Sequence, residues 1–198
     1  GKLDEAIEAY TKALSIKPDF AEVQSNIGAV WQSRDQPKQA IKAYKRAISI
    51  KPDYGPAYYN LGVVFQERGK IEEAVEAYNK AILIKPDYGE VHRTLSTIKK
   101  YTVKDPHFIQ VKKLYDERGH SEETMCNLNF ALAKMYEDIG KLDEAFAHLS
   151  GGNELRKKLL KYSINQDREL FTKLRNTQPH LLDSSLERKE ISIGPIPI

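Results

Sequence analysis

The chain is poor in the residues and runs that build disulfides, membrane spans and nucleic-acid surfaces. Cys126 is the only cysteine among 198 residues, which excludes an internal disulfide and favours a reducing compartment such as the cytoplasm. No apolar run approaches the roughly 18 residues that a membrane helix requires, so no membrane partner is expected. The formal net charge of +3 is close to balance, and no basic stripe is interleaved with aromatic residues. Nucleic acid is therefore not an expected partner.

The motifs of common enzymes and metal sites are missing as well. The sequence has no Gly-rich loop followed by lysine, no His-Glu-x-x-His and no pair of cysteines. Its five histidines are His92, His107, His120, His148 and His180. They lie at least a dozen residues apart, and we expect each to be a surface or half-buried structural residue rather than a ligand. No catalytic residue, metal or cofactor is therefore expected.

Cys126 leaves two interpretations open. It lies near the predicted start of a helix, where the N-terminal dipole lowers the pKa of a thiol. The alternative, which we favour, is a small buried hydrophobic residue.

What the chain does have is a repeat of 34 residues within its first 88. The recurring residues are Ala6, Ala40 and Ala74, Tyr10, Tyr44 and Tyr78, and Ala13, Ala47 and Ala81. Each unit then closes on Ile-Lys-Pro-Asp, the last of them at residues 84–87. A fixed period in this range marks stacked units, none of which can bury its apolar face alone. The period predicts a binding surface before it predicts any chemistry.

The two complete units share a longer motif of a large residue, an aliphatic residue, glycine, an aromatic residue, alanine, tyrosine and proline. In the first unit these are Gln24, Ile27, Gly28, Trp31, Ala40, Tyr44 and Pro52; in the second they are Tyr58, Leu61, Gly62, Phe65, Ala74, Tyr78 and Pro86. This motif resembles the tetratricopeptide repeat (TPR). The apolar residues form one helical stripe, and the glycine leaves room for a second helix. The resemblance implies an all-α fold of about nine helices, stacked as antiparallel pairs in a right-handed superhelix.

The register gives the expected organisation of the chain. We expect residues 1–20 to be the second helix of a truncated repeat, 21–54 and 55–88 to be complete repeats, 89–120 a degenerate helix pair, 121–162 a TPR-like helix pair, 163–180 a C-terminal helix, and 181–198 an extended tail leading to a missing domain.

The two ends of the chain carry further predictions. Residues 1–6 repeat the turn of residues 69–74, so we interpret the chain as a fragment that begins inside a repeat. Its first apolar stripe, which lacks a partner helix, consists of Leu3, Ile7, Tyr10 and Leu14. An exposed stripe of this kind tends to recruit a partner, so a homodimer through this helix or through the tail is possible. The tail carries Pro195 and Pro197, which favour an extended chain packed against helices or in the groove.

After Pro86 the period slips. An apolar stripe predicts a helix over about 88–100, and Asp105 before Pro106 predicts an N-cap for a helix near 106–118. Ser121 is the expected N-cap of the next helix. Gly140 restores the register 71 residues after Gly69, so a degenerate unit lies between two recognisable ones.

The second half carries a narrower resemblance, to the linker segment of TPR-sulfotransferases. The matching segments are residues 130–140, 145–149, 152–153, 167–174 and 194–198. In that family a TPR array precedes a domain that uses the sulfate donor PAPS. This chain stops before the family's donor-binding loop, so the resemblance carries over no catalytic residue.

In a TPR array the first helices of successive units line a concave groove. By that geometry the peptide-binding residues would be Ser25, Asn26, Ala29, Gln32, Ser33, Tyr59, Asn60, Val63, Gln66, Glu67, Arg93, Thr94, Thr97 and Lys100. Asn26 and Asn60 are the most informative pair, and similar asparagines occur in the O-linked N-acetylglucosamine transferase array. Their amides either donate to and accept from the backbone of an extended peptide, or bond a neighbouring loop. The lysine and arginine clamp of chaperone-binding TPRs is not expected, because Ser25, Ala29, Glu90 and Thr94 occupy those places.

Two functions remain. The first is a scaffold that binds an extended peptide or a partner protein in the groove. The alternative is the non-catalytic front of a TPR-sulfotransferase, which presents substrate to a PAPS-dependent domain outside this chain. An enzyme built in the groove itself lacks any constellation of catalytic residues.

Overall fold

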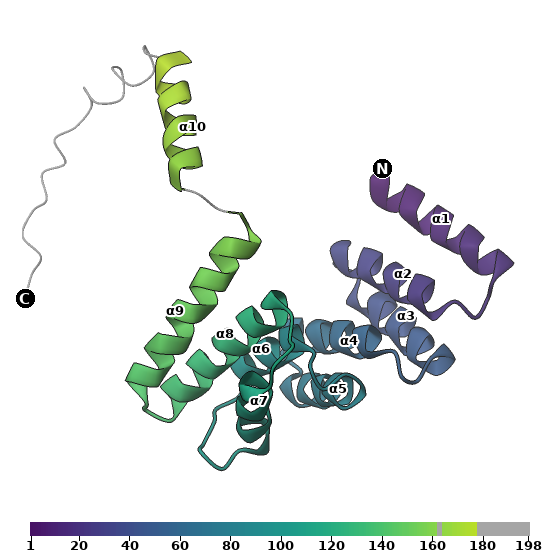
Figure 1. Ribbon diagram of the computed structural model, residues 1–198. Coiled ribbons are helices and arrows are strands. Elements are labelled where there is room, and N and C mark those ends of the chain that lie inside the picture. The colour runs from purple at the N-terminus through teal and green to yellow at the C-terminus, as the bar shows by residue number, and fades with distance from the viewer. Residues whose placement is uncertain (162–163, 178–198) are drawn as a thin grey trace, which may run out of the picture. The chain divides into compact units, whose positions relative to one another are not determined.

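The computed structural model describes residues 1–161 and 164–177, and these residues form ten helices and no strand (Figure 1). This confirms the all-α class, with one helix more than the nine expected. The chain divides into two compact units, Gly1–Arg156 and Lys157–Ile198. The second contains α10 (Ile164–Thr177), and the predicted tail lies outside the described residues. None of the described helices combines the length and apolar composition that a membrane span requires.

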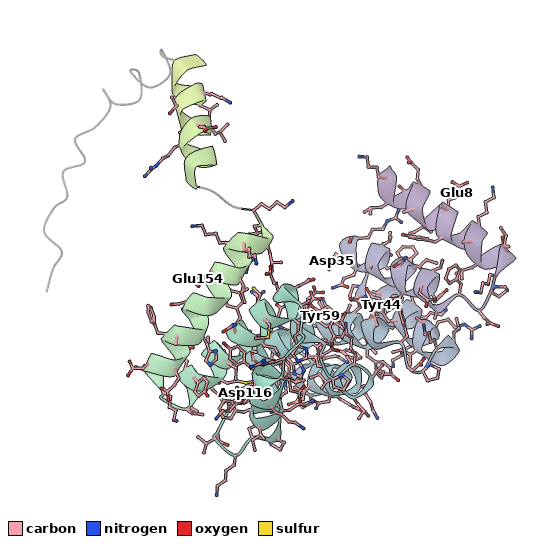
Figure 2. The ribbon with its side chains drawn as sticks, viewed as in Figure 1. Glu8, Asp35, Tyr44, Tyr59, Asp116 and Glu154 are labelled. Atoms are coloured by element: carbon pink, nitrogen blue, oxygen red, sulfur yellow. The ribbon has the colours of Figure 1, made fainter. Side chains whose placement is uncertain are left out.

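Two regular helix pairs form the first part of the array. They are α2 (Ala21–Ser33) with α3 (Pro37–Ile50), and α4 (Gly55–Glu67) with α5 (Ile71–Ile84). Within each pair the ring of a fully buried tyrosine lies directly on the glycine of the first helix. Tyr44, the tyrosine of the first pair, is labelled in Figure 2. A Cβ added at Gly28 would lie 2.6 Å from Tyr44 Cε1, and one at Gly62 would lie 2.5 Å from Tyr78 Cε1. The absence of a side chain at these two positions is therefore what lets the helices approach.

Successive pairs stack through their second helices. The helix α3 packs against α4, and α5 packs against α6 (Gly89–Ile98). At the first of these junctions Leu61 and Val64 of α4 share a buried cluster with Ala40 and Tyr44 of α3. In Figure 1 the helices α2, α4 and α6 follow one another along one side of this row, and α3 and α5 lie along the other.

The helix α1 (Lys2–Ile16) precedes this row and packs against α2. Tyr10 and Leu14 of the predicted stripe contact the buried cluster of Val23 and Ile27, and Arg34 pairs with Asp4. Leu3 remains 41 % exposed. Most of the stripe that was expected to lie open is thus half-buried against α2.

The helices after residue 88 are arranged differently. The helix α6 packs closely against α8 (Glu122–Asp138), and α7 (Pro106–Asp116) also packs against α8. The position of the repeat glycine is occupied in α6 by Ser96, which is fully buried. Its hydroxyl donates to the Arg93 carbonyl oxygen of the same helix at 2.6 Å. The core here is instead a cluster around Tyr101, Val111, Leu132 and Met135.

The predicted helix ends are confirmed with small shifts in their bounds. The Asp105 carboxylate accepts from the backbone N–H groups of His107 and Phe108, and the Ser121 hydroxyl accepts from that of Thr124. These contacts are N-caps that satisfy otherwise unpaired amides. The turns at Gly69 and Gly140 have φ angles of +69° and +76°, which glycine adopts without strain.

Candidate functional site

The candidate site is the surface of the first helices, where the predicted peptide-binding residues lie. Twelve of the fourteen predicted residues come from α2, α4 and α6 and keep at least part of their surface open, as does Lys100 beyond α6. Ser25 is the exception, because its side chain is only 3 % exposed and offers no surface to a ligand. The helical period placed Ser25 beside the apolar stripe, and close packing of α2 buries it.

Asn26 and Asn60 occupy the same position of two successive repeats, on α2 and α4. Asn26 is exposed and Asn60 is half-buried. No hydrogen bond joins either amide to another group within the described part of the chain. Bonding to a neighbouring loop, the alternative open at the sequence level, is therefore not what these amides do. Each keeps two N–H donors and an acceptor for another molecule.

The neighbouring glutamines, by contrast, are engaged within the protein. Gln32 Nε2 donates to both carboxylate oxygens of Glu67 at 2.9 Å, and Gln32 Oε1 accepts from the Tyr44 hydroxyl at 3.1 Å. Gln66 Oε1 accepts from the Tyr78 hydroxyl at 2.8 Å. Burial, together with the Glu67 carboxylate, raises the pKa of Tyr44 to about 12. These contacts connect the surface to the buried rings and hold it in one conformation.

An aromatic group adjoins Asn60 on α4. The ring of Tyr59 lies 5.9 Å from that of Tyr78 and 5.7 Å from that of Tyr88, and its hydroxyl donates to Glu90 Oε1 at 3.1 Å (Figure 2). The main cause that raises the pKa of Tyr59 is burial, so the phenol stays protonated at neutral pH and keeps its bond to Glu90.

The C-terminal end of this surface is basic. The Arg93 guanidinium lies over the ring of Phe130, with 4.8 Å between Cζ and the ring centroid. Thr94 and Thr97 donate to backbone carbonyls of their own helix, and Lys100 pairs with Asp138 of α8 at 3.0 Å. Of the predicted cations, Arg93 therefore remains without an ion pair among the described residues.

A buried hydrogen-bond chain, which the sequence analysis missed, connects α6 to α7. His92 Nε2 lies 2.7 Å from the Pro86 carbonyl oxygen, His92 Nδ1 lies 2.8 Å from His107 Nε2, and His107 Nδ1 lies 2.8 Å from the Tyr101 hydroxyl. A carbonyl only accepts, so His92 donates through Nε2, His107 donates through Nε2, and the tyrosine donates to His107. Both rings are buried, whereas the sequence led us to expect a surface or half-buried position for each.

Cys126 has the structural role that we favoured. It is buried, and its thiol lies 3.4 Å from the carbonyl oxygen of Gly152 in α9 (Leu142–Leu159). Burial raises the pKa of the Cys126 thiol, so the helix N-terminus does not activate it. No group of three or more possible metal ligands is present in the residues that the structure describes.

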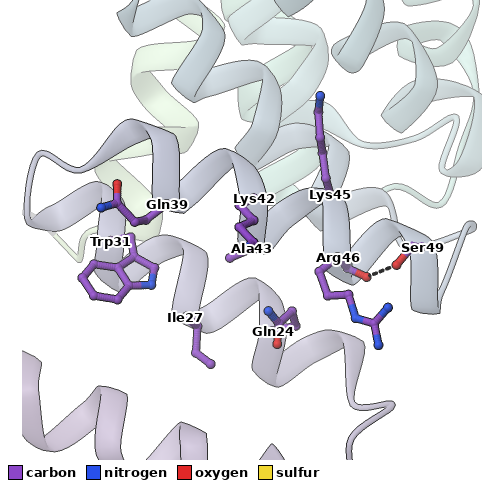
Figure 3. A pocket seen from close by; sticks show the side chains of 9 residues that line it. All are labelled: Gln24, Ile27, Trp31, Gln39, Lys42, Ala43, Lys45, Arg46 and Ser49. Carbon is purple, nitrogen blue, oxygen red and sulfur yellow. Dashed lines mark hydrogen bonds between the residues drawn. The ribbon is translucent and has the colours of Figure 1, made fainter.

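A cavity of about 700 Å³ lies between α2 and α3, away from every predicted groove residue (Figure 3). Ile27 and Trp31 are its apolar lining, and Lys42, Lys45 and Arg46 supply positive charge. A cavity of about 330 Å³ lies at the equivalent place one repeat later. The periodicity of the helices thus repeats this hollow along the array. The excess of positive charge is not repeated, because Glu73 and Glu76 line the second cavity together with Lys45 and Lys80.

Comparisons with known families and structures agree with this geometry. Family models described as "TPR repeat" match residues 1–34 and 33–69, and one described as "Tetratricopeptide repeat" matches residues 55–88. Tetratricopeptide-repeat models thus match residues 1–88 without a gap. No curated protein matches the chain.

Solved structures show that the TPR-like fold extends beyond these repeats. The crystal structure of MamA aligns with a TM-score of 0.56 and 23 % identity over 81 % of this chain and 92 % of that one. The TPR protein YrrB aligns with a TM-score of 0.53 and 22 % identity, over 74 % of each chain. PilF of Pseudomonas aeruginosa aligns with a TM-score of 0.51 and 19 % identity, over 83 % of this chain and 72 % of that one. At these identities the likeness concerns the fold alone.

Proposed function

We propose that this chain is a protein-interaction scaffold that binds an extended peptide of a partner protein along the first helices of its repeats. The observation that carries the proposal is the pair of in-register amides at Asn26 and Asn60, neither of which has a partner in the described residues. YrrB, which shares the fold, is described as having an unusual peptide-binding site, and that description concerns YrrB.

The chemistry of the amides suits a backbone ligand rather than one particular side chain. An amide that both donates and accepts pairs with the N–H and C=O of an extended chain whatever its sequence. The Gln32–Glu67 and Tyr59–Glu90 contacts fix the surface around the two amides before a ligand arrives. Such preorganisation reduces the entropy lost on binding.

The test starts with peptides selected by the full chain from a random library displayed on phage. Binding of a selected, fluorescently labelled peptide is then measured by anisotropy for the wild type, Asn26→Ala and Asn60→Ala. Loss of one net hydrogen bond of about 1 kcal/mol weakens binding roughly fivefold, and the double variant should lose more. Asn79→Ala is the matched control, because Asn79 is an exposed asparagine on a second helix, α5.

Circular dichroism and urea denaturation verify that the variants keep the fold of the wild type. Selection of no peptide would contradict the proposal, as would amide variants that bind as tightly as the Asn79→Ala control.

The sulfotransferase alternative remains a prediction from about residues 105–198. The proteins that give the structural likeness reported above are not described as sulfotransferases. The sequence of the gene beyond Ile198 decides it: a Gly-x-Pro-Arg-Ser-Gly-Thr-like run directly downstream would favour this alternative for the parent protein, and its absence would remove it.

A further inference from the structure

Two arginine side chains from different helices converge on one aromatic ring. Arg93 Cζ in α6 lies 4.8 Å from the ring centroid of Phe130 in α8, and Arg156 Cζ in α9 lies 5.9 Å from the same centroid. The distance between the two Cζ atoms is therefore at most the sum of these two distances. Phe130 and Arg93 are half-buried and Arg156 is exposed, so the cluster is open to an incoming group from one side.

Neither guanidinium is neutralised by a carboxylate within the described residues. The nearest acid on α6 is Glu90, which already accepts from the Tyr59 hydroxyl. The buried thiol of Cys126 lies near both charges. Burial raises the pKa of this thiol, the positive charges of Arg93 and Arg156 act in the opposite direction, and the carboxylate of Glu123 adds to the rise.

Like charges held near one ring repel each other, and an anion between them removes that cost. A guanidinium is a rigid planar fork that binds a carboxylate through two parallel hydrogen bonds, and it retains its charge when partly desolvated. The phenylalanine ring holds each cation by its face without competing for the N–H donors. The cluster therefore has the donors, the charge and the fixed geometry that a carboxylate needs.

The charge is confined to one end of the peptide-binding surface. The residues that precede Arg93 by one and two repeats are Tyr59 and Ser25, which are neutral. The acids on the same surface, Glu67 and Glu90, accept hydrogen bonds from Gln32 and Tyr59. A peptide lying across the asparagines thus meets neutral and acidic groups first and two free cations last.

We propose that Arg93 and Arg156, with the ring of Phe130 between their contacts, form a subsite for a carboxylate of the bound peptide. This inference rests on the proposed function, because the peptide supplies the carboxylate. It adds a ligand class to the groove: the partner segment carries an acidic residue at the α6–α8 end. It also places this acidic residue beyond the part of the peptide that bonds Asn26 and Asn60.

The experiment uses the full chain and the peptides selected from the random phage library, whose acidic residues are changed one at a time to their amides. For one acidic residue the change to Asn or Gln weakens binding roughly tenfold, as loss of a charge-assisted bond does. Arg93→Gln and Arg156→Gln weaken the parent peptide to a similar extent and leave the amide peptide unaffected. Arg46→Gln is the matched control, because Arg46 is an exposed arginine that lines a different cavity.

Peptides synthesised with an amidated C-terminus distinguish the two sources of the carboxylate, an acidic side chain or the end of the partner chain. The inference is overturned if selected peptides depend on Asn26 and Asn60 but are indifferent to their acidic residues and to both arginine variants. That result leaves the proposed function standing. If no peptide is selected, the proposed function fails and the subsite fails with it.

Discussion

Residues 21–88 and residues 89–156 solve the same packing problem in two ways. In the first region each pair of helices closes by laying a tyrosine ring on the backbone of a glycine, as Tyr78 does on Gly62. In the second region the α8–α9 pair has alanine at the glycine register, Ala133, and leucine at the tyrosine register, Leu149. A methyl group at the first position excludes the ring at the second, so the two substitutions belong together.

In the second region the close approach between helices therefore occurs at a different position of the repeat. Gly152 of α9 approaches α8, and a Cβ there would lie 3.2 Å from Phe130 Cε1. His148 of α9 stacks on Tyr136 with 5.3 Å between centroids and bonds Asn129 at 3.0 Å. The leucine freed from the interface is 43 % exposed, whereas Tyr78 is fully buried. The spacing of the repeat is thus kept in the second region, but different side chains make the contacts between its helices.

The prediction with the largest expected effect concerns Tyr78 and Leu149, which occupy the same position of the repeat. Tyr78→Ala removes a fully buried ring and its bond to Gln66, so we expect the free energy of unfolding to fall by about 3–5 kcal/mol. Leu149→Ala removes a side chain that already meets solvent, and we expect a loss below about 1 kcal/mol. Urea denaturation followed by circular dichroism measures both. Equal losses would show that the register position, and not its burial, decides the energy.

The dependence of stability on pH tests a second difference between the regions, because the buried histidines His92 and His107 both lie in residues 89–156. Burial, the neighbouring His92 and Lys99 hold the pKa of His107 at about 3, and burial also lowers the pKa of His92. In the unfolded chain an imidazole has a pKa near 6.5, so below that pH the unfolded state binds more protons than the folded state. Stability is therefore complete above about pH 6.5 and falls as the pH drops toward about 3.

For His107 alone this linkage removes about 2 kcal/mol between pH 7 and pH 5. The measurement is the free energy of unfolding at these two pH values for the wild type and for His107→Gln, which should lose much of the slope. His120→Gln is the control, since His120 lies outside the hydrogen-bond chain, and it should keep the slope. A His107 variant with the slope of the wild type would show that the chain of imidazoles does not set the acid sensitivity.

The sequence predicted well wherever local periodicity decides the structure. The repeat glycines and tyrosines, and the caps at Asp105 and Ser121, follow from spacing and backbone chemistry over a few residues. The prediction failed for His92 and His107, because the irregular segment 99–105 separates their two helices and gives no register that brings the rings together. The candidate site shows the same limit.

The asparagines are periodic and could be found from the sequence. The approach of Arg156 to Phe130 depends on how far α9 runs along α8, which no repeat in the sequence encodes. Exposure of groove residues was also beyond the pattern, as the buried Ser25 shows. The helical period predicts which face of a helix a residue lies on, and the packing of neighbouring helices decides how far its side chain is buried.

The smallest effect concerns how helices begin in the two regions. None of the N-cap residues of α2 to α5 makes a side-chain capping bond, whereas Asp105 caps α7 and pairs with Lys99 at 2.8 Å. Asp105→Ala leaves two helical amides without their acceptor, so we expect a loss of about 1–2 kcal/mol. Asp105→Asn retains an acceptor and should lose less, while Gln36→Ala at the start of α3 should stay within about 0.5 kcal/mol. Urea denaturation of the three variants decides this. A Gln36 variant as unstable as Asp105→Ala would mean that the regular repeats also depend on their caps, and the contrast between the regions would then lie in packing alone.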